Sequence, residues 1–176
     1  MHLGKCRIND GTDGIKVKSF DGYELSLKPN KIYKMAMSQE FYLEFDTKQC
    51  LKYNIQRTCM KTLTLKANKN NFTLNFDSLS HQVVVINLHF NKLIWSFQID
   101  MRVNGRHTGA QSQHGFMNIN QKAIGSYSID VHSVGILLDV SISEHSLNFG
   151  IPFLKYSGNI VGLCGKSTFN ISKFNV

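Results

Sequence analysis

Four cysteines carry the most definite chemistry in this 176-residue chain. They are Cys6, Cys50, Cys59 and Cys164, and no two of them form the Cys-x-x-Cys pair of a structural zinc site, so we expect no such site. Four cysteines allow three disulfide pairings. A bridge between Cys50 and Cys59 would close a small loop, and one between Cys6 and Cys164 would join the two ends. An even count suits an oxidising compartment, and the alternative is four reduced, buried thiols in a cytosolic protein.

The other reactive side chains form no recognisable catalytic pattern. The 12 acidic residues are scattered, and the chain has no Gly-x-Ser-x-Gly elbow, no P-loop and no Gly-x-Gly-x-x-Gly motif. His107 and His114 flank the glycine-containing segment 108–113. This pair is a candidate for metal binding, but a polar hairpin tip is the simpler interpretation. We therefore expect a protein that is not an enzyme, without catalytic or metal-binding residues.

Two N-glycosylation sequons occur, Asn71-Phe72-Thr73 and Asn170-Ile171-Ser172. They matter only if the chain enters the secretory pathway. On that condition, Asn71 and Asn170 are the predicted attachment sites.

The elements that must position these residues are predicted to be β-strands. Apolar residues alternate with period two in short runs that recur about every 8–12 residues, which favours an all-β fold. The dipeptides Asp10-Gly11, Asp13-Gly14, Asp21-Gly22 and Asn104-Gly105 are hairpin signals between such runs. We predict a mostly antiparallel sandwich of many short strands with little helix. The predicted strands are 15–18, 23–27, 41–45, 60–66, 72–76, 82–90, 92–103, 126–131 and 136–142.

The formal net charge is +8, from 20 basic and 12 acidic residues. This excess fits an acidic partner, such as a glycan, an anionic membrane or a nucleic acid, although a solvated lysine-rich surface explains it equally. Lysines are spread along the chain and arginine is scarce, whereas phosphate and base recognition favours clustered arginine. A nucleic-acid-binding domain would use aromatic side chains as a stacking platform. Phe72, Phe76, Phe90 and Trp95 are the candidates, but the alternation predicts that they fill the core instead.

The segment before the chain end carries the sequence motif that is most specific for a protein family. Asn148-Phe149-Gly150-Ile151-Pro152 is followed by Tyr156-Ser157-Gly158 and then by Gly162-Leu163-Cys164-Gly165. This order resembles the closing signature of the von Willebrand factor type D domain. The opening is similar to that family as well, because Cys6 precedes Phe20-Asp21-Gly22-Tyr23.

The middle of the chain carries two further resemblances to type D domains. Cys50 and Cys59 precede Lys61-Thr62-Leu63-Thr64-Leu65, like the small-loop cysteine pair of the family, and Val103-Asn104-Gly105 resembles its hairpin. The match covers about residues 6–170, so residues 1–176 are predicted to be one domain. The resemblance implies the pairs Cys6–Cys164 and Cys50–Cys59.

The sequence also departs from the family. Residues 9–14 contain no Asp-Pro bond, so the self-cleavage of some members is not expected. Members often bind calcium just after Gly-Leu-Cys-Gly, but segment 166–173 has two lysines and no carboxylate, the ligand that calcium prefers. We therefore expect no cofactor. The additional cysteines of multimerising members are missing, so disulfide-linked multimers are not expected either.

A type D domain with few cysteines is most similar to those of the large lipid transfer proteins, the vitellogenins and apolipophorins. The resemblance implies a non-catalytic extracellular module from a secreted lipid-transport or yolk-storage lipoprotein, with the signal peptide upstream in a precursor. Its expected partners are the rest of that precursor, lipid, and an anionic receptor or glycan, but no nucleic acid. Two alternatives remain open. One is an adhesive or matrix type D module, and the other is a cytosolic basic β domain that binds nucleic acid.

Overall fold

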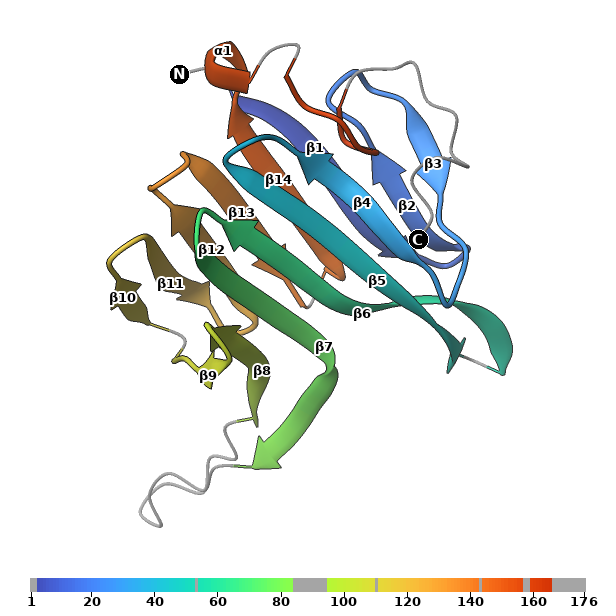
Figure 1. The fold of residues 1–176 in the computed structure, drawn as a ribbon. Coiled ribbons are helices and arrows are strands. Elements are labelled where there is room, and N and C mark those ends of the chain that lie inside the picture. Colours follow the sequence, from blue (N-terminus) through green and yellow to red (C-terminus); the bar gives the residue numbers. More distant parts are fainter. Residues whose placement is uncertain are drawn as a thin grey trace, which may run out of the picture.

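The computed structural model describes residues 3–52, 54–83, 95–109, 111–142, 144–156 and 159–165. These ranges hold fourteen β-strands and one helix of four residues. The strands form two antiparallel sheets, here called sheet A and sheet B, whose apolar faces enclose one core (Figure 1). The predicted all-β fold is therefore confirmed. No helix within the described ranges is long and apolar enough to cross a membrane.

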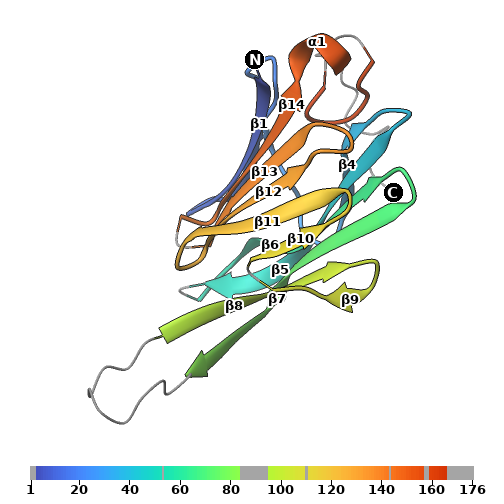
Figure 2. The same ribbon diagram turned by 90° about the vertical axis from the view of Figure 1, so that its left-hand side faces the viewer.

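Sheet A has eight strands and places β1 (Leu3–Gly11), near the beginning of the chain, beside β14 (Ser146–Pro152) (Figure 2). β1 lies between β14 and β2, and Cys6 of β1 faces Phe149 of β14. The strand order is β10 (Ser112–His114), β11 (Met117–Ala123), β12 (Ser126–Val131), β13 (Ile136–Ser141), β14 (Ser146–Pro152), β1 (Leu3–Gly11), β2 (Gly14–Lys18) and β3 (Glu24–Ser26).

Sheet B is a six-stranded meander in which each strand pairs with the next one in the sequence. At the β8–β9 turn, Asn104 (φ 50°) and Gly105 (φ 79°) both have the positive φ that a type I′ hairpin turn requires, as their sequence predicts. The helix α1 (Phe153–Tyr156) directly follows β14. The strands of sheet B are β4 (Ile32–Met37), β5 (Phe41–Lys52), β6 (Ile55–Ala67), β7 (Asn70–Val83), β8 (Trp95–Val103) and β9 (Arg106–His107).

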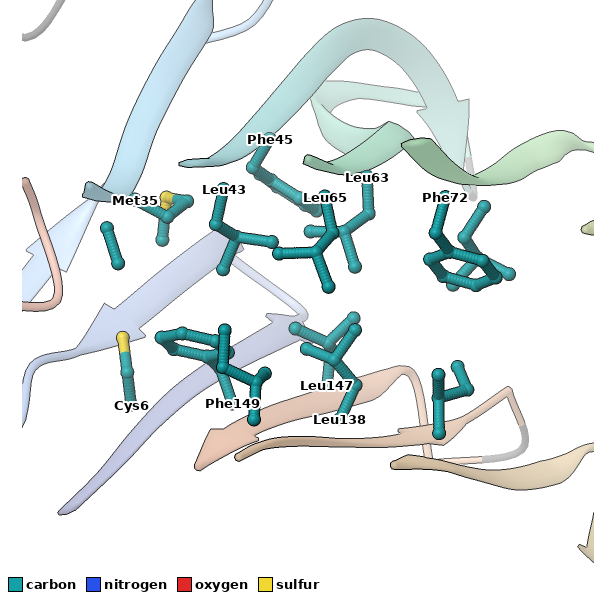
Figure 3. Close-up of a cluster of buried hydrophobic side chains, with 14 of the residues drawn as sticks. Cys6, Met35, Leu43, Phe45, Leu63, Leu65, Phe72, Leu138, Leu147 and Phe149 are labelled. Atoms are coloured by element: carbon teal, nitrogen blue, oxygen red, sulfur yellow. The ribbon is translucent and has the colours of Figure 1, made fainter. Parts of the chain in front are cut away.

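The core lies between the two sheets, and alternate residues of each strand point into it (Figure 3). Successive side chains of a strand face opposite sides of the sheet, so the period-two pattern of the sequence becomes one buried and one exposed face. Sheet B contributes Leu43, Phe45, Leu63, Leu65 and Phe72, and sheet A contributes Leu138, Leu147 and Phe149.

The structure corrects the predicted strand boundaries. β5 and β6 extend well beyond the alternating segments 41–45 and 60–66, because polar residues on both strands continue their pairing as far as Lys52 and Ile55. The sequence pattern did not predict β1, β4, β9, β10, β11 or β14. β11 has only two buried apolar residues, Met117 and Ile119, which is too short a run to recognise as alternation. Most of the predicted strand 82–90 lies outside the described residues.

Candidate functional site: two disulfides and a cationic sheet face

The first disulfide joins Cys6 of β1 to Cys164, with a Cα–Cα distance of 5.4 Å. Both cysteines are fully buried. Cys164 also donates its N–H to the carbonyl of Met35 in β4, at 2.7 Å, and Val161 pairs with Met37 of the same strand. Because Cys6 belongs to sheet A and the segment 159–165 pairs with sheet B, this bridge fastens the two sheets together near the start of β1.

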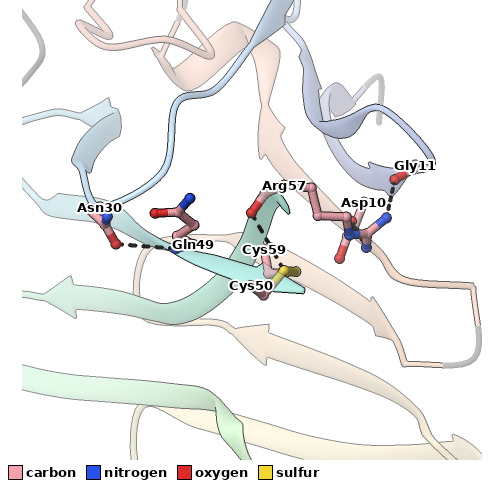
Figure 4. The surroundings of a disulfide bond; sticks show 7 residues. All are labelled: Asp10, Gly11, Asn30, Gln49, Cys50, Arg57 and Cys59. Atoms are coloured by element: carbon pink, nitrogen blue, oxygen red, sulfur yellow. Dashed lines mark hydrogen bonds and ion pairs between the residues drawn. A yellow bond between two sulfur atoms is a disulfide. The ribbon is translucent and has the colours of Figure 1, made fainter. Parts of the chain in front are cut away.

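The second disulfide joins Cys50 of β5 to Cys59 of β6, with a Cα–Cα distance of 5.9 Å (Figure 4). Its neighbour Arg57 reaches across to sheet A. The Arg57 Nη2 atom lies 2.6 Å from Oδ1 of Asp10, and Nη1 donates to the carbonyl of Gly11 at 2.7 Å. The two charged side chains are only 7% and 9% exposed. The β5–β6 hairpin is thereby attached to the far end of β1. The structure thus contains the same two cysteine pairs that the resemblance implies.

Removing Arg57 should destabilise the fold strongly, since it leaves the Asp10 carboxylate buried without its partner. We expect Arg57→Met to lower the free energy of unfolding by about 3 kcal/mol, measured by urea denaturation. The double variant Arg57→Met/Asp10→Leu should recover part of this loss, because no unpaired charge remains. Equal losses in the single and double variants would show that the ion pair does not couple the two residues.

A second charged cluster joins the β4–β5 turn of sheet B to α1. Lys155 Nζ and Tyr156 Oη each lie 2.5 Å from Oε2 of Glu40, and Tyr156 Oη also lies 2.8 Å from the carbonyl of Val134. Hydrogen bonds from Lys155 and then from Tyr156 hold the pKa of Glu40 below its ordinary value. The cluster borders a hollow of about 330 Å³. The Glu40 carboxylate is already bound by Lys155 and Tyr156. The cluster therefore has a structural role, which is to hold the two sheets together.

Buried and half-buried tyrosines make the fold sensitive to alkaline pH. Burial raises the pKa of Tyr42, Tyr127 and Tyr156 above the ordinary value of 10.0. Above about pH 10 the unfolded chain loses phenol protons that the folded chain keeps, so the free energy of unfolding should fall as the pH rises. Urea denaturation at a series of alkaline pH values measures this slope. Tyr156→Phe should reduce the slope, and an unchanged slope would remove Tyr156 from the effect.

His107 and His114, the candidate metal pair, bind different neighbours. His107 Nδ1 lies 2.8 Å from Asp100 Oδ1, and its Nε2 lies 3.2 Å from a guanidinium nitrogen of Arg102. His114 Nε2 lies 3.0 Å from Thr108 Oγ1. The Arg102 charge beside His107 disfavours a cation there. Among the residues that the structure describes, no group of three His, Cys, Asp or Glu side chains is placed to hold a metal ion.

Of the two predicted glycosylation sites, Asn71 lies within the described residues. Asn71 is the second residue of β7, where its N–H donates to Oδ1 of Asn104 at 2.8 Å, and its own Oδ1 is buried. Glycosylation of Asn71 stays a prediction. Asn170 lies outside the described residues.

The candidate stacking aromatics are used for packing where the structure describes them. Phe72 is 1% exposed, and Phe76 packs against the core. Neither is therefore available as a nucleic-acid platform. Phe90 lies outside the described residues, and only the strand position of Trp95, in β8, is described.

The outer face of β1 and β2 carries a group of exposed cations, here called the cationic face. It consists of Lys5, Arg7, Lys16 and Lys18, which alternate along their strands with buried core residues. A hollow of about 300 Å³ lies over the same two strands and includes Arg7, Lys16 and Lys18 in its lining. Sequence reasoning missed this group because β1 was not predicted as a strand.

Comparison of the chain with models of known protein families gives no match, and comparison with curated protein sequences gives none. Membership of the type D family therefore stays a prediction.

Proposed function

We propose that this chain is a non-catalytic extracellular module of the von Willebrand factor type D kind, from a secreted lipid-transport or yolk-storage lipoprotein. Its role there is to contribute a stable framework and a surface for receptor or matrix contacts. The observation that carries the proposal is the Cys6–Cys164 disulfide. It links the opening strand to the Gly-Leu-Cys-Gly segment, and these are the two places where the sequence most resembles type D domains.

Two features support an extracellular location. All four cysteines are paired in disulfides, which persist in oxidising compartments and are rare in the cytosol. The bridges also connect elements that the fold needs to keep together, since Cys6 and Cys164 are 158 residues apart and fasten the two sheets. A reducing environment would remove both connections.

The charged side chains support a structural rather than a catalytic use of the polar clusters. Arg57 and Asp10 connect the β5–β6 hairpin to β1, and Glu40 connects the β4–β5 turn to α1. Each cluster therefore joins sheet A to sheet B. The cationic face is a candidate surface for a partner.

The test is to locate the native protein in its source with an antibody raised against this chain. We expect it in extracellular fluid, within a lipid-containing particle that floats in a density gradient. Non-reducing peptide mapping of that material should identify Cys6–Cys164 and Cys50–Cys59. A lipid-free cytosolic protein with four free thiols would overturn the proposal. A secreted, disulfide-bonded but lipid-free protein would agree with the proposed extracellular module but would refute its assignment to a lipoprotein.

A further inference from the structure

The cationic face brings like charges together in a way that folding alone does not favour. Arg7 lies directly opposite Lys18 in the β1–β2 ladder. Directly opposed residues of an antiparallel pair have Cβ atoms about 5 Å apart, and like charges at that position are destabilising. Neither Arg7 nor Lys18 forms an ion pair with any residue that the structure describes.

Other cations in the two sheets are arranged differently. Lys61 pairs with Asp46 at 2.8 Å, and Lys122 pairs with Asp139 at 2.7 Å. These two lysines lie next to carboxylates that offset their charge. On the cationic face, Lys16 has only a long contact of 3.6 Å to the exposed Asp13. Lys18 has the Glu24 carboxylate opposite it in the β2–β3 ladder, whereas the ladder neighbours of Arg7 are Lys18 and the neutral Asn148. The positive charge of Arg7 on this face therefore has no carboxylate among its ladder neighbours.

The four cations also form an extended row. Lys5 and Arg7 follow each other on β1, and Lys18 and Lys16 follow each other in the antiparallel direction on β2, with Lys16 opposite Asn9. From the level of Lys5 to that of Asn9 is four residues, or about 13 Å along the strands. This length exceeds a single phosphate or carboxylate, so it fits a partner with several anionic groups in line.

Neutral hydrogen-bonding groups lie beside the row. Asn148 of β14 lies opposite Arg7, and Asn9, which follows Arg7 on the same face of β1, lies opposite Lys16. Charges alternating with amides match a chain that carries both anionic groups and hydroxyl groups. A membrane surface would instead require apolar side chains that insert between lipids, whereas the apolar residues of β1 and β2, such as Ile8 and Val17, face the core.

We infer that the cationic face is a binding surface for a sulfated glycan. The inference rests on the proposed function in one respect, because sulfated glycans are encountered outside the cell. Sulfate groups of the glycan would lie between Arg7 and Lys18 and would replace their mutual repulsion by attraction. The Glu24 carboxylate lies opposite Lys18 in the β2–β3 ladder. Its negative charge would repel sulfate, so the binding surface ends at β3.

The test measures binding to immobilised heparin at increasing salt, using oxidised protein in which peptide mapping has identified both disulfides. We expect the affinity of the unchanged protein to fall steeply with salt, because ionic contacts are screened. Arg7→Glu/Lys18→Glu should lower the affinity at least about tenfold, roughly the effect of losing one strong ionic contact. The control is Lys66→Glu, an exposed position in β6 of sheet B whose ladder neighbours are Tyr42 and Asn71. It should change the affinity less than about twofold.

The single variant Arg7→Glu separates binding from folding. It places a carboxylate opposite Lys18, and its other ladder neighbour, Asn148, is neutral, so the urea midpoint of unfolding should rise while heparin affinity falls. Three results would overturn the inference: an equal loss with Lys66→Glu, equal binding of desulfated heparin, or tighter binding to vesicles of anionic phospholipid. Because the disulfides are mapped first, weak binding by a correctly bridged protein would leave the proposed module intact, whereas free thiols would refute the module itself.

Discussion

Removing the Cys6–Cys164 bridge will cost about twice as much free energy of unfolding as removing the Cys50–Cys59 bridge. The bridged residues are 158 and 9 positions apart, respectively. A bridge stabilises mainly by restricting the unfolded chain, and the loop-entropy relation gives about 5 kcal/mol for the long loop and about 2.5 kcal/mol for the short one. The native structure adds to the difference. The β5–β6 hairpin stays paired through its ladder without its disulfide, whereas the segment 159–165 has only a few bonds to β4.

The variants for this test are Cys6→Ala/Cys164→Ala and Cys50→Ala/Cys59→Ala, each compared with the unchanged protein by urea denaturation at neutral pH. Replacing both members of a pair avoids a free thiol that could form wrong bridges. The two double variants remove the same atoms, so they are controls for each other. Equal losses of stability would show that loop closure is not the source of the effect.

The substitution Gly162→Ala should weaken the attachment of the segment 159–165 to β4 while leaving both disulfides in place. Gly162 has a φ of +136°, and a Cβ atom there would lie 2.6 Å from the carbonyl oxygen of Met35 and 2.9 Å from the nitrogen of Ala36. Both are backbone atoms of β4, so they cannot turn aside. The segment would have to move away, which would break the 2.7 Å bond from the Cys164 N–H to Met35. We expect a loss of about 3 kcal/mol or more.

Gly22→Ala is the matched control for this prediction. Gly22 also has a positive φ, +85°, but nothing lies within 4 Å of the added Cβ atom. Gly22→Ala should therefore lower the free energy of unfolding only through the unfavourable backbone conformation, by about 1 kcal/mol. Urea denaturation of the two variants separates strain from collision. If both substitutions lower the free energy of unfolding equally, the collision of the added Cβ atom with β4 does not contribute to the effect at Gly162.

Local patterns in the sequence were sufficient for the fold class. Alternation such as Leu63-Thr64-Leu65 places side chains on opposite faces of a strand whatever its partners are, and Asn104-Gly105 selects its turn by its own backbone preferences. These are properties of residues one or two positions apart, so they can be read without the structure. The count and the chain positions of the cysteines likewise indicated bridges before any geometry was known.

The tertiary structure alone decided which distant residues meet. Arg57 and Asp10 are 47 positions apart and Tyr156 and Glu40 are 116 apart, and no pattern in the sequence links either pair. The cationic face depends on register, because Arg7 opposes Lys18 only when β1 and β2 pair from Gly11 and Gly14 outward. Such contacts arise from the packing of two sheets around a shared core, a collective outcome that short-range side-chain patterns do not encode.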